Sequence, residues 1–220
     1  MTGLQLDIAH LLAGGLVLVS FLLLYQTRMF ALLKVFALHA VVVALAVAWQ
    51  AHIQGAAHLY ITAALALALK AALIPTALYQ IIKRLEIHRE IETVVGIGPT
   101  MLAGIGLVGL SIALMLRVTE AAGPVAREDL AFALAVVLVG LLMMVTRRNA
   151  LGQVIAFMSI ENGLILAAAG AQGMPLVVEI SIAFSVLIAL IVIGVFLFRI
   201  RERFDTVDVH VLDLAGGERI

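Results

Sequence analysis

Apolar residues occur in long stretches along this chain, and short clusters of charged residues separate them. A helix that crosses a membrane needs about 20 consecutive, mostly apolar residues, so apolar stretches of about 18 or more predict such helices. The sequence predicts seven transmembrane helices, near 6–26, 30–53, 59–82, 98–117, 129–147, 150–171 and 176–199. In residues 84–97, charged residues alternate with Ile, Leu and Val, which predicts a short amphipathic connector before Pro99 begins the fourth helix.

The composition also indicates a membrane protein. Of the 220 residues, 64% are hydrophobic and only 13% are charged, and the mean hydropathy is +1.19. A typical soluble domain has about 25% charged residues. A single globular core of this size would leave no polar surface, so lipid must surround most of the chain. The sequence therefore predicts an all-α, polytopic integral membrane protein with no sizeable soluble domain.

Basic residues predict the orientation of the helices. Arg117 and Arg127 lie on one side of the membrane, mixed with Glu120, Glu128 and Asp129. Eleven of the fourteen basic residues fall on the other side: Arg28, Lys34, Lys83, Arg84, Arg89, Arg147, Arg148, Arg199, Arg201, Arg203 and Arg219. Because cytoplasmic loops are rich in Lys and Arg, we expect the N-terminus outside and the C-terminus in the cytoplasm. The expected location is the cytoplasmic (inner) membrane, with multiple spans.

Several classes of function are excluded by composition. The sequence has no cysteine, which excludes iron–sulfur clusters, thiolate metal sites and disulfides. Lys and Arg together number 14, as do Asp and Glu, so no charge bias indicates a nucleic-acid partner. The sequence also has no recognisable nucleophile–base pair. We therefore expect a protein that is not itself an enzyme and binds no cofactor or metal.

Three glycines reproduce the spacing of a dinucleotide-binding motif. Gly104, Gly106 and Gly109 spell GxGxxG, but that motif requires a preceding strand and a βαβ unit. Here the glycines lie within an apolar helix. We therefore expect them to serve close packing between helices.

We take four ionisable residues as lying at membrane depth: His39, Lys70, Glu161 and Glu179. A charged group at the centre of a bilayer costs about 2.5–3.5 kcal/mol on insertion scales, so each one is a functional hypothesis by default. His39 lies about nine residues from a helix end, and Lys70 and Glu161 about eleven; at a rise of about 1.5 Å per residue, all three fall near the bilayer midplane. Glu179 lies only about four residues from the outer surface, and therefore away from the midplane.

A base, an acid and an imidazole at one depth predict a lateral proton relay, because side chains of these types can exchange protons near neutral pH in a buried environment. We therefore take Glu161, Lys70, His39 and Glu179 as candidate proton-path residues. Simpler interpretations remain open. A Lys–Glu pair can hold two helices together, the histidine can bond to a backbone carbonyl, and Glu179 can be an interfacial residue. Pro75 removes one helical hydrogen bond close to the lysine and leaves a carbonyl free.

One segment resembles known ion-translocating subunits. Residues Arg147–Ala168 read RRNALGQVIAFMSIENGLILAA: a helix ends in Arg-Arg-Asn, and the next helix carries a Glu followed by an Asn. This pattern is similar to the three-helix K subunit of respiratory complex I and the C subunit of multisubunit sodium/proton antiporters, to which residues 129–199 would correspond. The four additional helices of residues 1–128, with connector 84–97, the IENG motif and the RFDTVDV sequence of tail 200–220 resemble component E of hydrogenase-4.

This resemblance implies a membrane subunit of a formate hydrogenlyase-type complex. Its partners would be antiporter-like membrane subunits, the subunits of a nickel–iron hydrogenase module, and membrane lipid. The K subunit uses a glutamate of its second helix in a lateral proton path, and this role carries over to Glu161, although Glu161 lies about one helical turn later. The K subunit's second glutamate has no counterpart in residues 183–189, and we expect Lys70 and His39 to take that part.

Three hypotheses follow for the function. The first is a non-catalytic subunit that contributes to proton or sodium translocation and to assembly of the membrane arm. The second is a scaffold whose buried polar residues fix the register of the helices. The third is a subunit of a stand-alone cation/proton antiporter. The sequence does not distinguish a proton from a sodium ion as the transported species.

Overall fold

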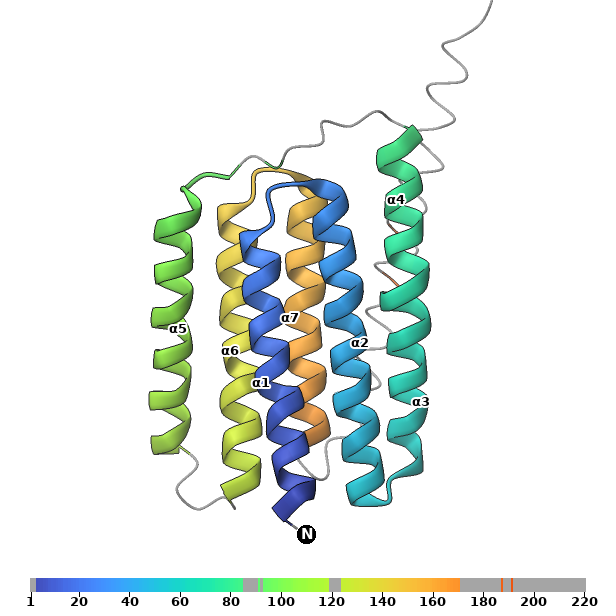
Figure 1. Ribbon diagram of the computed structural model, residues 1–220, viewed down its shortest axis with the longest axis vertical. Coiled ribbons are helices and arrows are strands. Elements are labelled where there is room, and N and C mark those ends of the chain that lie inside the picture. The colour runs from blue at the N-terminus through green and yellow to red at the C-terminus, as the bar shows by residue number, and fades with distance from the viewer. Residues whose placement is uncertain are drawn as a thin grey trace, which may run out of the picture.

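The computed structural model describes residues 3–84, 91, 93–118, 124–170, 187 and 191. Every regular element in these ranges is a helix (Figure 1). The elements are α1 (Gly3–Tyr25), α2 (Met29–Gln54), α3 (Ala57–Leu65), the π-helix η1 (Ala66–Leu73), α4 (Ile74–Arg84), α5 (Ile97–Val118), α6 (Pro124–Thr146) and α7 (Ala150–Gly170).

Six of the predicted transmembrane helices are confirmed as helices that are long and apolar enough to cross a membrane. The third predicted span is built from α3, η1 and the first part of α4, which follow one another without a break. The seventh, 176–199, lies outside the described residues apart from Leu187 and Ile191. Glu179 and the tail 200–220 also lie outside them, and the orientation across the membrane stays a prediction.

The surface of the bundle is apolar. Leu11 is 73% exposed, Leu102 is 72% exposed and Val145 is 77% exposed. Large exposed apolar side chains on three separate helices are unfavourable in water but suit contact with lipid tails. The protein is therefore a membrane protein.

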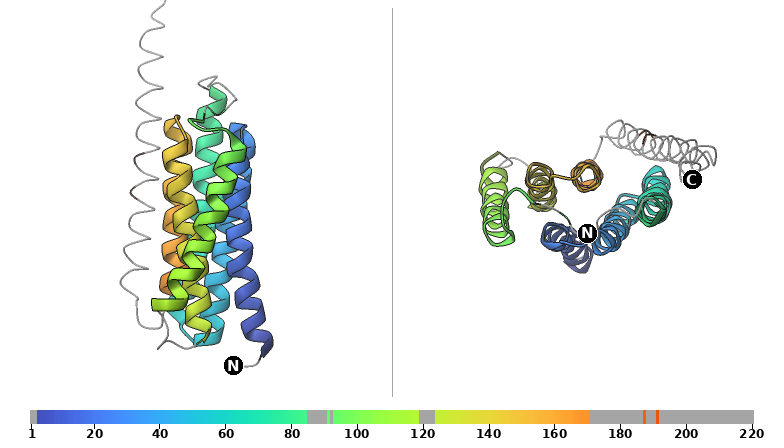
Figure 2. Two further views of the ribbon diagram at one scale, coloured as in Figure 1. Left: turned by 90° about the vertical axis from the view of Figure 1, so that its left-hand side faces the viewer. Right: turned by 90° about the horizontal axis from the view of Figure 1, so that it is seen from above.

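Four helices form the centre of the bundle. α1 packs against α2 and α6, and α7 packs against α2 and α6. α5 lies beside α6, and the continuous rod of α3, η1 and α4 lies beside α2 (Figures 1 and 2). The proposed division between residues 1–128 and 129–199 stays a prediction, but helices from both sides of it share one core.

Glycines allow α6 and α7 to approach each other closely. A Cβ atom on Gly140 would lie 2.7 Å from Cγ1 of Ile160, and one on Gly163 would lie 2.8 Å from Cγ2 of Val137. Between helices in lipid, small residues of this kind permit the close van der Waals contact that drives association. The expectation for the GxGxxG glycines was only partly right. Gly104 packs on Phe21, whereas nothing lies within 4 Å of a Cβ placed on Gly106.

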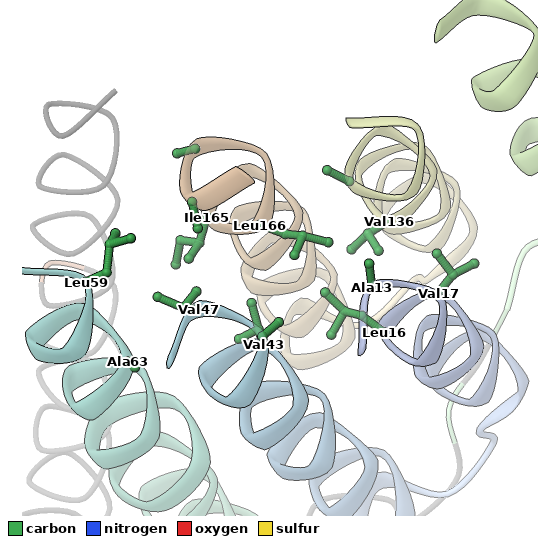
Figure 3. Packing of buried hydrophobic residues seen from close by; sticks show 14 of the residues in the cluster. Ala13, Leu16, Val17, Val43, Val47, Leu59, Ala63, Val136, Ile165 and Leu166 are labelled. Carbon is green, nitrogen blue, oxygen red and sulfur yellow. The ribbon is translucent and has the colours of Figure 1, made fainter. Parts of the chain in front are cut away.

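The buried apolar side chains form two clusters along the bundle. We call the end where α1 and α6 begin the N-terminal end, and the other the opposite end (Figure 1). Nearer the N-terminal end, one cluster joins α1, α2, α6 and α7 through residues that include Leu16, Val43, Val47, Val136 and Leu166 (Figure 3). The second cluster, nearer the opposite end, includes Leu32, Phe36, Leu78, Met143 and Ile155.

The connector before α5 binds the turns at the opposite end. Ile91 is buried, and its N–H donates to the carbonyl of Thr27 between α1 and α2 at 2.7 Å. The N–H of Val94 donates to the carbonyl of Thr146 at the end of α6 at 2.9 Å. The described part of the connector therefore ties together two turns that are distant in the sequence. Pro99 lies in the first turn of α5, where proline is tolerated.

Candidate functional site

A stretch of π-helix presents Lys70 to the interior of the bundle. The N–H of Ile74 donates to the carbonyl of Leu69, five residues earlier, and Pro75 has no N–H to donate. The carbonyl of Lys70 therefore receives a helical hydrogen bond neither from residue 74, as in an α-helix, nor from residue 75, as in a π-helix. This agrees with the expectation that Pro75 leaves a carbonyl free close to the lysine. π-Helical turns occur often at functional sites. The side chain of Lys70 is only 1% exposed.

Lys70 makes two polar contacts with α7. Its Nζ lies 3.1 Å from Oε2 of Glu161 and donates to Oδ1 of Asn162 at 2.8 Å. Glu161 is 4% exposed and Asn162 is fully buried. The buried ammonium group thus has both a counter-charge and a neutral acceptor, as a charge in a low-dielectric environment requires.

His39 extends this contact across the bundle. The Nδ2 of Asn162 lies 2.9 Å from Nδ1 of His39, and Nε2 of His39 lies 2.9 Å from Oγ of Ser20. The hydroxyl of Ser20 donates to the carbonyl of Leu16 at 2.9 Å. We call Ser20, His39, Lys70, Glu161 and Asn162 the central polar network. It joins α1, α2, η1 and α7.

The hydrogen bonds of the central polar network run in one direction. The single hydroxyl proton of Ser20 is directed to the carbonyl of Leu16, so Oγ of Ser20 accepts a hydrogen bond from Nε2–H of His39. Nδ1 of His39 is then the acceptor for the Asn162 amide, whose oxygen accepts from Lys70. In this arrangement His39 is neutral, because one of its ring nitrogens donates and the other accepts.

The structure brings together three of the four candidate proton-path residues. Glu161, Lys70 and His39 belong to one network, and Glu179 lies outside the described residues. Ser20 and Asn162, which complete the row of hydrogen bonds, were not among the predicted site residues. The only signal for Asn162 was its position next to Glu161 in the IENG motif.

The Arg-Arg-Asn turn fastens three helices at the opposite end of the bundle. Arg147 is 2% exposed, and its Nη2 donates to the carbonyls of Leu23 and Leu24 at 3.1 and 2.8 Å. Burial lowers the pKa of the Arg147 guanidinium group. Asn149 caps α7, because its Oδ1 accepts from the N–H of Gly152 at 2.7 Å. The bonds of Arg147 therefore anchor the end of α1 to the turn that connects α6 and α7.

Within the described ranges, no three His, Asp or Glu side chains are grouped so that they could hold a metal ion. The central polar network contains a lysine, a carboxylate and an imidazole, which can exchange protons and compensate one another's charge. Asn162 connects these groups without being ionisable itself.

Comparison with known proteins identifies one relative. No family model matches the chain, and no solved structure matches it. The uncharacterized protein Rv0085 of Mycobacterium tuberculosis (strain ATCC 25618 / H37Rv) is 31% identical over 203 residues. The match covers 91% of this chain and 92% of the relative. This protein therefore belongs to the same family as Rv0085.

Proposed function

We propose that this protein is a non-catalytic, ion-translocating subunit of a membrane-bound nickel–iron hydrogenase or formate hydrogenlyase-type complex in the cytoplasmic membrane. The observation that carries the ion-translocating role is the central polar network, in which a buried Lys70–Glu161 pair is hydrogen-bonded to His39 through Asn162. The choice of complex rests on the resemblance of residues Arg147–Ala168 and the tail to subunits of such complexes.

The path of the network supports lateral transfer. The network runs from η1 through α7 and α2 to α1, across the bundle and not along its axis. Polar groups at this depth are costly, and well-packed apolar residues often stabilise a core as well as a buried ion pair does. An ionisable row in this position therefore favours a role in moving charge between neighbouring subunits.

Asn162 determines how charge can move. A proton that arrives at Nδ1 of His39 converts this atom from an acceptor to a donor, and the Asn162 amide must then turn over so that Oδ1 accepts from it. Nδ2 of Asn162 then faces Nζ of Lys70, which releases one proton to the carboxylate of Glu161. His39 has gained one proton and Lys70 has lost one, while the amide keeps both of its own. The orientation of the Asn162 amide thus selects between two charge states: a neutral His39 with a charged Lys70, and a charged His39 with a neutral Lys70.

The test of the complex is a mild-detergent pull-down of a tagged copy, followed by mass spectrometry and a hydrogen-evolution assay. Co-purification of hydrogenase and antiporter-like subunits with hydrogen evolution is the expected result. Antiporter-like subunits without hydrogenase would favour the stand-alone antiporter. Recovery of the protein alone would contradict the proposed partners.

The test of the translocating role uses the purified complex in liposomes. Glu161→Gln removes the carboxylate and should abolish ion movement, while hydrogen evolution from an artificial electron donor continues. Asp7→Asn is the matched control, since Asp7 is an exposed carboxylate on α1, and it should translocate normally. Normal translocation by Glu161→Gln would refute the relay.

A scaffold is the second candidate function. The contacts of Arg147 with the end of α1, and of Lys70 with α7, hold separate helices together. If this were their whole purpose, removal of the ion pair would impair assembly and ion movement together. Variants that assemble but do not translocate would exclude it.

A further inference from the structure

A second buried carboxyl group lies at the N-terminal end of the bundle. Asp129 of α6 is 2% exposed, and its Oδ2 accepts from Nε2 of Gln50 on α2 at 2.8 Å. Its Oδ1 is buried and has no hydrogen-bond partner among the described residues. Asp129 was predicted as the first residue of the fifth helix, grouped with the charges of the preceding loop. α6 begins five residues earlier, at Pro124, and places Asp129 in its second turn, within the bundle.

The single donor to Asp129 is held in a fixed orientation. Nε2 of Gln54 donates to Oε1 of Gln50 at 3.2 Å and to the carbonyl of Ala169 at 2.7 Å. The amide oxygen of Gln50 is therefore directed toward Gln54, and its nitrogen toward Asp129. One oxygen of Asp129 is satisfied by this neutral amide, and the other is available for a further group.

The surroundings of Asp129 favour a proton as that group. A carboxylate that serves only structure normally accepts through both oxygens when buried, and no described cationic side chain forms an ion pair with Asp129. The charged and titratable groups near it are His10 of α1 and the adjacent Glu128. α2 contributes the amide of Gln50, α7 contributes the Cα of Gly170, and α5 contributes the Ser111 hydroxyl, which donates to Ala131. The one basic residue of α5, Arg117, is exposed.

His10 and Glu128 form a partly exposed pair near Asp129. Glu128 is 53% exposed at its side chain, and its Oε2 lies 3.1 Å from Nδ1 of His10, which is 27% exposed. The other ring nitrogen of His10 is buried and has no hydrogen-bond partner in the described ranges. Because an imidazole can accept at one nitrogen and donate from the other, His10 can pass a proton inward. Exposure thus falls from Glu128 through His10 to Asp129.

We propose that Asp129 is a proton-binding site, filled through Glu128 and His10 from the aqueous phase at the N-terminal end of the bundle. One proton passes from water to the Glu128 carboxylate, then to His10, and finally to Oδ1 of Asp129. The bound ligand is a single proton. Glu128 returns to a carboxylate, whereas His10 is left with its proton on Nδ1, so its ring must turn over before the next transfer. As the outer acid of a translocation path, Asp129 deepens the proposed function and rests on it, but proton binding itself does not depend on the hydrogenase assignment.

An apolar layer separates Asp129 from the central polar network. Asn162 and Ala169 on α7 are seven positions apart, which corresponds to about 10 Å along the helix axis. Val47, Val136 and Leu166 lie between the two groups by their positions along α2, α6 and α7, and all three belong to the buried apolar cluster of Figure 3. Transfer of a proton between the two groups therefore requires water to enter this layer, which makes Asp129 a separate site in the structure.

Infrared difference spectroscopy on the full-length protein in lipid nanodiscs tests proton binding directly. Lowering the pH should produce the carbonyl band of a protonated carboxylic acid in the wild type. This band should be lost in Asp129→Asn and retained in Glu161→Gln and in the exposed control Asp7→Asn. A band that persists in Asp129→Asn, or a wild type with no titrating buried carboxyl group, would overturn the proposal.

A second variant tests the assignment of the band without removing Asp129, in case Asp129→Asn does not fold. Gln50→Leu leaves the carboxyl group in place but removes the donor to Oδ2, and it should shift the frequency of the Asp129 band. An unshifted band would show that it does not come from Asp129. Circular dichroism of each variant establishes that the helices are intact.

The access route is tested by pH-jump kinetics on the same band. Glu128→Gln and His10→Phe should reach the wild-type amplitude but slow its appearance by roughly 100-fold, the effect expected for loss of a well-placed proton donor. Unchanged rates would refute the route. Because these measurements use the isolated chain, failure of the hydrogenase pull-down would leave them unaffected, and failure here would leave the pull-down unaffected.

Discussion

Asn162 donates through Nδ2 to Nδ1 of His39 at 2.9 Å, which fixes the buried imidazole as an acceptor at that nitrogen. The hydroxyl of Ser20, bonded to the other ring nitrogen, directs its own proton to the carbonyl of Leu16. The tautomer of His39 is thus determined by one amide and one hydroxyl group. Neither group can lose its proton near neutral pH.

Replacing Asn162 should therefore change the protonation of His39. Asn162→Asp replaces the amide that donates to Nδ1 of His39 with a carboxylate, which can only accept. We therefore expect His39 to carry a proton on Nδ1 in this variant. Nitrogen-15 NMR of the labelled imidazole distinguishes the two nitrogens. Ser159→Ala is the control, because its Oγ lies 3.5 Å from Nε2 of His39 and its loss should leave Nδ1 unchanged. A wild-type spectrum in Asn162→Asp would contradict the assigned network.

Removing one partner of the buried ion pair should cost more than removing both charges. Lys70→Met leaves the Glu161 carboxylate buried without its counter-charge, and we expect a loss of about 3–5 kcal/mol in the free energy of unfolding. Glu161→Gln should lower the free energy of unfolding less than Lys70→Met does, because Lys70 keeps its hydrogen bond to Asn162. The double variant should recover most of the stability lost in Lys70→Met. Equilibrium unfolding in detergent measures all three.

The same double variant separates a relay from a scaffold. With both charges removed, the complex should assemble normally and fail to move ions in liposomes. If the double variant does not assemble although its helices are stable, the ion pair serves assembly. If it assembles and translocates at the wild-type rate, the relay assignment is wrong.

Replacement of the two arginines of the Arg-Arg-Asn turn should have very different effects on stability. Arg147→Met removes the donor to the carbonyls of Leu23 and Leu24, and we expect a loss of about 1–3 kcal/mol in stability. Arg148→Met is the matched control; its side chain is exposed, and the change should be within about 0.5 kcal/mol. The loss should not depend on pH in the physiological range. Burial lowers the pKa of Arg147, but a guanidinium group stays protonated there. Equal effects of the two variants would contradict the buried position of Arg147.

Alanine should be tolerated at one glycine and not at another. In Gly140→Ala the new methyl group would meet Ile160 at 2.7 Å and force α6 and α7 apart. Overpacking of this kind costs about 1–3 kcal/mol. Gly106→Ala adds a methyl group where nothing lies within 4 Å, and it should gain about 0.5–1 kcal/mol from reduced backbone entropy. Thermal unfolding of the two variants checks the opposite signs, and similar destabilisation by both would contradict the packing of α6 on α7.

The length of each apolar stretch sufficed to predict six of the helices, because the thickness of a bilayer fixes how many residues a span needs. Counting along those helices also placed His39, Lys70 and Glu161 at a common depth, since the rise per residue is constant. The packing of Gly104 against another helix was likewise expected, because small residues in apolar helices permit close contact. The outside position of the N-terminus, the seventh span and the role of Glu179 stay predictions.

Only the tertiary structure decided which side chains meet. A helix that is apolar on nearly every side has no polar face from which its rotation can be deduced, so the sequence left open whether Lys70 faces Glu161, lipid or water. The π-helical turn before Pro75 changes the register of the third span. Asn162, Ser20 and Asp129 acquire their importance from neighbours on other helices. The depth of a residue follows from its position in one helix, but its partners depend on how all the helices pack.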